Sequence, residues 1–182
     1  MIEVEKKFRP TEEQLAKLLE GAEFVGEKTV HDVYYDYPDF RMFKKDIRLR
    51  NRNGNFELKI GDDEIAGIAE EIEDEGEIQK YFATELPLKA FIKENLVELI
   101  NYKQNRKKYK KGDFTIDIDD LDFGYSCVEI ELLVNTESEI ETARTRIFDL
   151  AKENNFEIMD IPSKRKEYLR KKNPEAYKEI YG

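Results

Sequence analysis

The sequence predicts an α+β protein, an eight-stranded antiparallel β-barrel that is closed or nearly closed and has helices packed outside it. Three observations lead to this fold class. Extended segments joined by short turns dominate the chain, roughly four amphipathic helical segments interrupt them, and most extended segments follow one another as hairpins. Closing such a sheet removes its free edges. The 182 residues show no abrupt change in composition, so we expect a single domain over residues 1–182.

The chain begins with a strand and a short helix. Residues 2–8 alternate charged and apolar side chains, which is typical of a strand. Thr11 and Gln14 have the spacing of a capping box. The leucines that follow at helical intervals predict a helix that ends at Gly21.

Strand character then extends from about residue 23 to residue 82. Within it, Asn53-Gly54 lies between two alternating runs, as a two-residue hairpin turn does. The apolar spacing over residues 86–101 predicts a helix next. The residues expected on its apolar stripe are Leu88, Phe91, Ile92, Leu96, Leu99 and Ile100.

Three consecutive extended segments follow between residues 102 and 134, and their spacing predicts antiparallel hairpins. Thr136 and Glu139 then form a capping box before another helix. The apolar stripe of this helix consists of Ile140, Ala143, Ile147, Leu150 and Ala151. Residues 162–182 predict one or two short, very polar helices.

The composition argues against some classes of function. Charged residues make up 40% of the chain and the formal net charge is −10, which argues against a nucleic-acid coat protein. A small anionic ligand is compatible with this charge, because salt screens distant acidic residues beyond about 10 Å. No apolar run reaches the roughly 20 residues of a membrane span, and the charged N-terminal strand is unlike a signal peptide. We therefore expect a cytoplasmic protein with no membrane or nucleic-acid partner; no oligomeric state follows from the sequence.

Charged residues alternate with branched aliphatic residues on several predicted strands, and same-sign clusters lie on particular strands. The acidic clusters are Glu3 and Glu5, Asp117 and Asp119, and Glu129 and Glu131; the basic cluster is Arg48, Arg50 and Arg52. For a single strand, a solvated face opposite an apolar core face explains this pattern. A solvated surface would usually mix the signs, however. The alternative is a barrel whose charged faces point inward, around a divalent cation and phosphate groups, while helices cover the aliphatic outer face.

Several stretches of the chain carry a more specific pattern. They are IEVEKKF at residues 2–8, in which Glu3, Glu5 and Lys7 form an ExExK signature, VYYDYP at 33–38, IRLR at 47–50 with FELK at 56–59, IDIDDLDFGYSCVEIE at 116–131, and PSKRKEYL with NPEAYKEI near the end. Taken together and in this order, they resemble the CYTH superfamily, the triphosphate tunnel metalloenzymes. The similarity is greatest to the thiamine triphosphatase branch of that superfamily.

The resemblance implies an eight-stranded tunnel that binds a triphosphate through basic side chains and a divalent metal. The implied metal ligands are Glu3, Glu5, Asp117, Glu129 and Glu131, with Glu71 or Glu73 as a further acidic position. The metal would be magnesium, with manganese as an alternative.

The implied phosphate-binding residues are Lys7, Arg48, Arg50, Lys59, Arg106 and Lys164, with Arg52 as a further candidate. In similar enzymes a lysine and a tyrosine in the motifs of Lys59 and Tyr34 act together near the scissile phosphate, and Lys164 matches a lysine that closes one tunnel mouth. These three residues are the catalytic candidates. Because Arg52 adjoins the Asn53-Gly54 turn, we expect it in solvent, where it matters less than Arg50.

The resulting hypothesis is a magnesium-dependent enzyme that hydrolyses the terminal phosphate of a small triphosphate. The chain has no tryptophan, although thiamine enzymes of the family carry one just before the paired arginines. Thiamine triphosphate, inorganic tripolyphosphate and nucleoside triphosphates therefore all stay open as substrates. Two alternatives are a class IV adenylate cyclase, which converts ATP to cyclic AMP and pyrophosphate, and a module that binds triphosphate or polyphosphate without turnover. We expect the single His31 to be structural and Cys127 to be a buried apolar residue.

Overall fold

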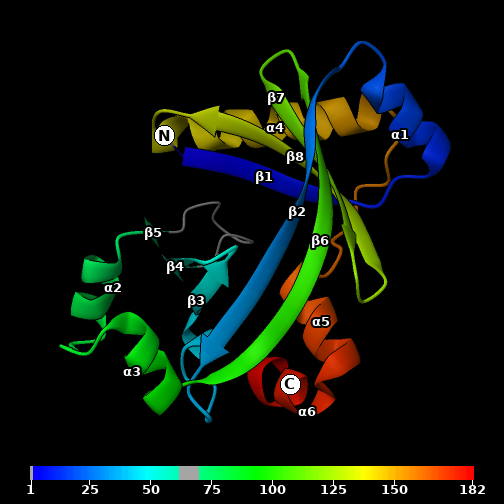
Figure 1. The fold of residues 1–182 in the computed structure, drawn as a ribbon. Coiled ribbons are helices and arrows are strands. Elements are labelled where there is room, and N and C mark those ends of the chain that lie inside the picture. Colours follow the sequence, from blue (N-terminus) through cyan, green and yellow to red (C-terminus); the bar gives the residue numbers. More distant parts are fainter. Residues whose placement is uncertain (1, 62–69) are drawn as a thin grey trace. The chain divides into compact units, whose positions relative to one another are not determined.

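The computed structural model describes residues 2–61 and 70–182, which form eight strands, six α-helices and two short 3₁₀ segments (Figure 1). The strands are β1 (Ile2–Phe8), β2 (Glu23–Asp36), β3 (Ile47–Arg52), β4 (Asn55–Ile60), β5 (Glu70–Ile72), β6 (Val97–Lys111), β7 (Phe114–Leu121) and β8 (Tyr125–Val134). The α-helices are α1 (Glu12–Leu19), α2 (Glu75–Tyr81), α3 (Leu88–Asn95), α4 (Ile140–Glu153), α5 (Lys164–Lys172) and α6 (Pro174–Tyr181). The 3₁₀ segments are η1 (Phe43–Lys45) and η2 (Glu137–Glu139).

The strands form one sheet in the order β1-β8-β7-β6-β2-β3-β4-β5. Hairpins join β3 to β4, β6 to β7 and β7 to β8, and the chain's first strand pairs with its last. This arrangement confirms the predicted α+β class with eight antiparallel strands.

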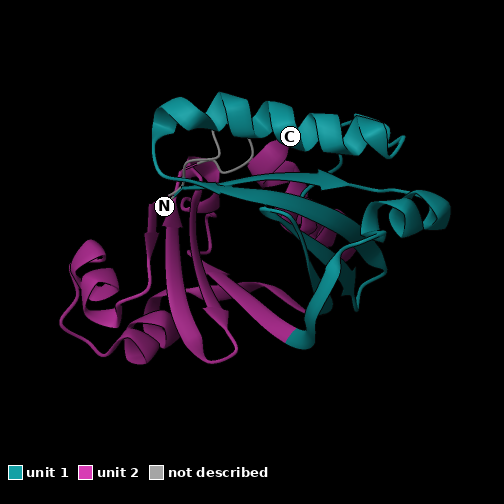
Figure 2. Ribbon diagram, turned by 90° about the horizontal axis from the view of Figure 1, so that it is seen from above, with its two compact units in different colours: residues 1–29, 104–163 teal, residues 30–103, 164–182 magenta. Residues whose placement is uncertain are grey.

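Two compact units divide the chain, and both are discontinuous in sequence (Figure 2). Unit 1 comprises residues 1–29 and 104–163, and unit 2 comprises residues 30–103 and 164–182. The long strands β2 and β6 pass from one unit to the other. The expectation of a single domain stays a prediction.

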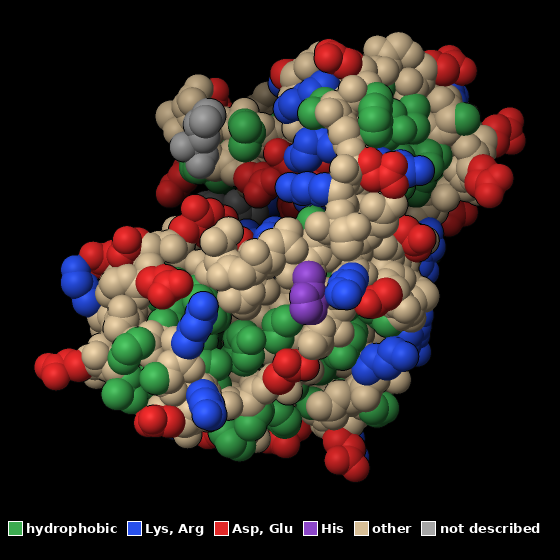
Figure 3. All heavy atoms as spheres, viewed as in Figure 1, with side chains coloured by type: hydrophobic (Ala, Val, Ile, Leu, Met, Phe, Trp, Pro, Cys, Tyr) green, Lys and Arg blue, Asp and Glu red, His purple; other side chains and the backbone are tan. Residues whose placement is uncertain are grey.

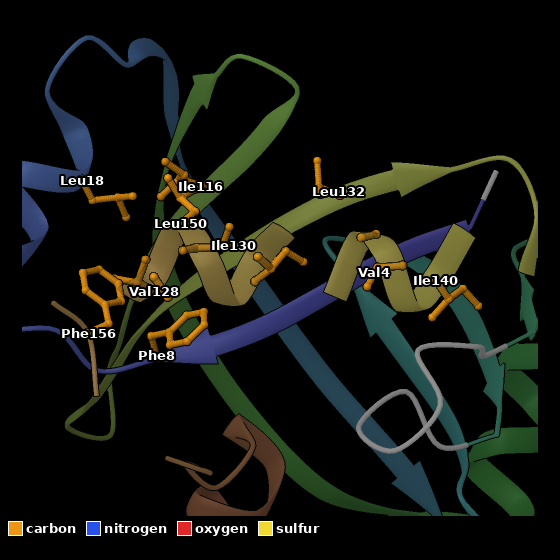
Figure 4. Packing of buried hydrophobic residues seen from close by; sticks show 13 residues of the cluster. Val4, Phe8, Leu18, Ile116, Val128, Ile130, Leu132, Ile140, Leu150 and Phe156 are labelled. Carbon is orange, nitrogen blue, oxygen red and sulfur yellow. The ribbon is translucent and has the colours of Figure 1, made fainter. Parts of the chain in front are cut away.

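The core of unit 1 lies between its strands and α4. Alternate residues of β1, β7 and β8 point toward this helix, and Figure 4 shows Val4, Phe8, Ile116 and Ile130 packed with α4 side chains. All five residues predicted for the apolar stripe of α4 are buried in this cluster. Because side chains alternate across a strand, the charged residues of the same strands lie on the opposite face.

The core of unit 2 is built in the same way. Leu49, Phe56 and Leu58 of β3 and β4 pack against α2 and α3, which contribute Ile78 and Phe91 among others. The arginines of β3 therefore lie on the face of the strands that α2 and α3 do not cover.

Two sequence predictions are wrong at the α2–α3 region. The helix expected over 86–101 ends at Asn95, and Leu99 and Ile100 belong to β6. Within the segment expected to be extended up to residue 82, α2 forms instead, with the Asp74 side chain accepting a hydrogen bond from the Glu77 amide at its N-terminus. Residues 62–69 of that segment lie outside the described residues.

Candidate functional site

One face of the unit 1 strands collects the charged residues of β1, β8, β7 and β6, and we call it the acidic face. The strand registers place Lys7, Glu129, Asp117 and Lys108 in one row, and Glu5, Glu131, Thr115 and Lys110 in the next. Asp117, Asp119 and Glu129 are buried, with 2%, 0% and 6% of their surface exposed. A solvated face would leave these carboxylates in water, so that explanation fails for β7 and β8.

Arg106 lies among the carboxylates of the acidic face. Its Nε and Nη2 atoms donate to the two oxygens of Asp119 at 2.7 and 2.6 Å. Nη2 also donates to Glu129 at 2.7 Å, and Nη1 lies 2.6 Å from one oxygen of Asp117. Lys108 lies 3.2 Å from the other Asp117 oxygen. Burial raises the pKa of the Asp117 carboxyl, although both cations act in the opposite direction.

Glu3 and Glu131 form a carboxyl pair at the β1–β8 junction. Burial, together with the hydrogen bond and the charge of Glu3, raises the pKa of Glu131 to about 8. A proton therefore holds the pair together at neutral pH. Two adjacent carboxyls that need a positive charge between them are a suitable place for a hard divalent cation, which prefers oxygen ligands.

Lys7 contacts carboxylates in both rows of the acidic face. It forms an ion pair with Glu5 and lies 3.4 Å from Glu129. The structure thus brings all five carboxylates predicted as metal ligands to one face of unit 1, together with Lys7 and Arg106.

Cys127 is buried as expected; it belongs to β8 and lies opposite Asp119 of β7. Its sulfur and one oxygen each from Asp119 and Glu129 lie within 4.8 Å of one another, a spacing that could suit a metal. Arg106 contacts both carboxylates of this group, so a cation is already in place there.

The basic residues of unit 2 also share one face, which we call the basic face. Its rows are Arg48, Lys59 and Glu71; Tyr34, Arg50 and Glu57; and Asp32 with Arg52. Arg48 and Arg50 are buried, with 3% and 8% of their surface exposed. As on the acidic face, burial contradicts a solvated sheet surface.

Arg50 contacts three side chains of the basic face. Its Nε donates to Glu57 at 2.5 Å, and its Nη1 and Nη2 atoms lie 3.5 Å from the Tyr34 hydroxyl and from Glu71. Glu71 also lies 3.3 Å from the Lys59 amine. Glu71 is therefore the acidic residue of β5 that faces these cations, whereas Glu73 follows the strand and is exposed. Arg48 donates from Nη2 to the Gly61 carbonyl at 2.5 Å.

Tyr34 is fully packed beside Arg50 and Tyr102. Burial would raise the pKa of its hydroxyl, but the positive charge of Arg50, with smaller contributions from Arg165 and Arg52, lowers that pKa overall. Tyr34 and Lys59 lie on the same face, in adjacent rows. The register thus brings the predicted catalytic pair to one face of unit 2.

Arg52 does not lie in solvent, so that expectation is wrong. Its Nε and Nη2 atoms donate to the two oxygens of Asp32 at 2.7 and 2.8 Å, and Asp32 is completely buried. The strand continues to Arg52 in register, and the cross-strand carboxylate holds the guanidinium against the sheet. Lys164, the first residue of α5, is also buried. Burial raises the pKa of Asp32, but Arg52, and after it Arg50 and Lys164, lower that pKa overall.

Sequence reasoning missed three carboxylates at these faces, namely Asp32, Glu57 and Asp119 as the partners of arginines. Alternation alone places each of them on the charged face of its strand. The missing information was the register, which pairs Arg52 with Asp32, Arg50 with Glu57 and Arg106 with Asp119.

On the face of the molecule seen in Figure 3, acidic and basic side chains are scattered among apolar ones over most of the surface, and several basic side chains gather in its upper part. His31 lies outside the clusters, with its ring 2.8 Å from the Asn101 side chain, which is consistent with a structural role. Within residues 2–61 and 70–182, no helix combines the length and apolar character needed to cross a membrane.

The chain matches the CYTH domain model over residues 1–158. It is 27% identical to a human protein named thiamine-triphosphatase, over 99% of this chain and 89% of that protein. A protein of Methanocaldococcus jannaschii named "Putative adenylate cyclase" is 30% identical over 93% of this chain and 97% of its own length. The solved structure of the PH1819 protein from Pyrococcus horikoshii has a TM-score of 0.64 and 25% identity, and covers 88% of this chain and 94% of that one. The chain belongs to the CYTH family.

Proposed function

We propose that this protein is a metal-dependent hydrolase that removes the terminal phosphate of a small triphosphate. The observation that carries the proposal is the basic face, where Arg48 and Arg50 are buried and the Lys59 side chain, in the row of Arg48, is only 18% exposed. Buried cations are costly unless they are paired, and here Glu57 and Glu71 pair with them. The phosphates of a polyanion are a ligand of the same charge that these cations can bind. Membership of the CYTH family and the similarity to thiamine triphosphatase support the same function.

In this proposal the phosphate chain is held by Lys7, Arg48, Arg50, Lys59, Arg106 and Lys164. Arginines can present two parallel N–H groups to phosphate oxygens, whereas lysines act as point charges. Phosphoryl transfer spreads negative charge over the oxygens of the departing group, so fixed cations stabilise the transition state more than the ground state.

The proposed metal ligands are the carboxylates of the acidic face, Glu3, Glu5, Asp117, Glu129 and Glu131. The Glu3–Glu131 pair, which a proton holds together, is the part of this set that fits a divalent cation best. We propose magnesium, with manganese as an alternative. When bound, the ion would neutralise charge on the triphosphate and lower the pKa of a water molecule.

Tyr34 and Lys59 are the proposed catalytic pair. The Tyr34 hydroxyl can hold a proton in a hydrogen bond or release it more readily than an ordinary tyrosine, because Arg50 lowers its pKa despite its burial. Lys59 supplies a positive charge in the adjacent row, next to Glu71. Lys164, at the start of α5, is the alternative catalytic lysine.

A second candidate function is the conversion of ATP to cyclic AMP and pyrophosphate. The relative named as an adenylate cyclase, at 30% identity, is the observation that favours it. The thiamine triphosphatase match covers 99% of the chain, including the C-terminal helices α5 and α6, and favours hydrolysis.

A product assay separates these functions. The protein is incubated with magnesium and, in separate reactions, thiamine triphosphate, inorganic tripolyphosphate and ATP, and then orthophosphate, pyrophosphate and cyclic AMP are quantified. We expect orthophosphate from at least one substrate, no cyclic AMP, and loss of turnover in excess EDTA. Cyclic AMP with pyrophosphate would support the cyclase instead, and tight binding without any product would indicate a binding module.

A further inference from the structure

We propose that Arg106 is the cation that bridges Asp117, Asp119 and Glu129 in the metal-free protein, and that metal binding frees it for the phosphate. The inference rests on the proposed function, because it describes how the metal and the triphosphate share the same residues. Arg106 would then couple the binding of the metal to the binding of the triphosphate, rather than being a fixed phosphate-binding residue.

The contacts of Arg106 carry the inference. All three guanidinium nitrogens contact carboxylates: Nε and Nη2 contact Asp119, Nη2 also contacts Glu129, and Nη1 contacts Asp117, at distances between 2.6 and 2.7 Å. Only 16% of the Arg106 side chain is exposed. A phosphate that needs this guanidinium therefore has to compete with three buried carboxylates.

The three carboxylates do not have the same role in the proposal. Asp117 and Glu129 belong to the proposed metal ligands, whereas Asp119 does not. Asp119 takes two parallel hydrogen bonds from Arg106 and lies directly opposite it in the strand register. A metal that takes Asp117 and Glu129 thus removes two contacts of Arg106 but leaves the two-bond contact with Asp119 as its anchor.

Electrostatics make the competition unavoidable. A guanidinium and a divalent ion that share a carboxylate repel each other strongly in a partly buried site. Either cation can balance Asp117 and Glu129, but both cannot do so fully at once. Metal binding should therefore weaken the hold of these carboxylates on Arg106, and the released N–H groups gain a phosphate oxygen as their partner.

This linkage predicts two effects of opposite sign when Arg106 loses its charge. The Arg106→Gln variant should bind magnesium more tightly in the absence of triphosphate, on the order of tenfold, because its competitor is gone. In the presence of saturating magnesium, the same variant should bind a triphosphate more weakly, because one phosphate-binding residue is missing. A residue that served only the fold would not produce opposite shifts for the two ligands.

Isothermal titration calorimetry on the full chain measures both affinities. Magnesium is titrated first into metal-free protein, and a non-hydrolysable imido analogue of tripolyphosphate is then titrated into the magnesium-loaded protein. The control is Arg146→Gln, because Arg146 is also paired with an aspartate: its Nη2 atom donates to both oxygens of Asp113, at 2.8 and 2.7 Å, on the exposed surface of unit 1. The control loses the same charge and should leave both affinities near those of the wild type.

If Arg106→Gln does not fold, two other measurements test the same inference. Arg106→Lys keeps the charge but not the set of contacts, and should shift both affinities in the same directions to a smaller extent. In the wild type, NMR signals of the Arg106 Nη groups should change on magnesium addition, while the Nε signal, anchored by Asp119, changes least.

Equal magnesium affinity in the wild type and a folded Arg106→Gln variant would overturn the inference while leaving the metal site intact. Magnesium affinity that falls in this variant would overturn it as well, because Arg106 would then assist the metal. No magnesium binding by any of the proteins would instead contradict the proposed function, and the inference would fail with it.

Discussion

Asp32 and Asp119 are both fully buried, and each accepts two hydrogen bonds from one arginine on the neighbouring strand. A buried carboxylate without such a partner would have a large unfavourable desolvation energy. The two pairs therefore fix the positions of Arg52 and Arg106 as well as neutralising the carboxylates. At the scale of single residues, the charged faces are held by these pairs rather than by isolated side chains.

The Asp32–Arg52 pair leads to a stability prediction. Arg52→Ala should destabilise the protein by about 3 kcal/mol or more, because it leaves Asp32 buried without its main counter-ion. Arg146→Ala, which breaks an exposed arginine–aspartate pair, should change stability by no more than about 1 kcal/mol. Urea unfolding of both variants measures the difference. Similar small losses would show that Arg52 behaves as a surface residue after all.

The residues of the candidate site were largely predictable, but their pairing was not. The family motifs located Glu3, Glu5 and Lys7 from the sequence, and alternation put each of them on one face. The partner of Arg52 could not be read in this way, since it depends on which β2 residue faces β3. A one-residue change in register would place a different side chain opposite every arginine.

At the scale of elements, features set by local chemistry were predicted correctly. Both capping boxes form, at Thr11 and at Thr136. Asn53 and Gly54 make the β3–β4 turn with φ values of 51° and 98°, the left-handed conformation that such a hairpin turn requires. These features depend on a few neighbouring residues, so the sequence contains all the information that they need.

The boundary of α3 was not predictable from local pattern. Leu99 and Ile100 fit the helical spacing, yet they lie in β6 and are buried there. A short apolar run satisfies either period, and pairing with neighbouring strands decides between them. α2 was also not predicted, although its Asp74 N-cap is a local signal that the sequence contains.

The Glu3–Glu131 pair between β1 and β8 makes the free energy of unfolding of the metal-free protein depend on pH. Folded Glu131 keeps its proton up to about pH 8, whereas its pKa in the unfolded chain is near 4.5. Between these values the folded state binds more protons than the unfolded state, so stability should fall as pH rises. Glu131→Gln should remove this part of the slope and be more stable than the wild type at pH 8.

Urea unfolding at pH 5, 6.5 and 8 in EDTA measures this slope. Glu13→Gln, on the exposed side of α1, is the control and should keep the slope of the wild type. If the stability of the wild type rises steadily from pH 5 to pH 8, Glu3 and Glu131 do not share a proton in the folded state. An unchanged dependence of stability on pH in Glu131→Gln would lead to the same conclusion.

At the scale of the whole molecule, both units repeat one construction. In each, apolar side chains of the strands pack against helices, α4 in unit 1 and α2 with α3 in unit 2, and charged side chains fill the opposite face. The sequence predicted this division because alternation over many strands is a strong signal when the strands are taken together. The family match over residues 1–158 supports the same fold.

The part that the basic face takes in triphosphate binding is tested by a comparison of Arg50→Gln with Arg41→Gln. Arg50 is buried on the basic face beside Tyr34 and Glu57, whereas the side chain of Arg41 is 57% exposed. The specificity constant of each variant is measured on magnesium tripolyphosphate and on thiamine triphosphate, with circular dichroism to confirm folding. We predict that Arg50→Gln loses about 2 to 4 kcal/mol of transition-state stabilisation, because a phosphate contact is removed, and that Arg41→Gln retains nearly full activity. Small and equal losses in two folded variants would contradict the account, because the basic face would then have no part in binding a triphosphate.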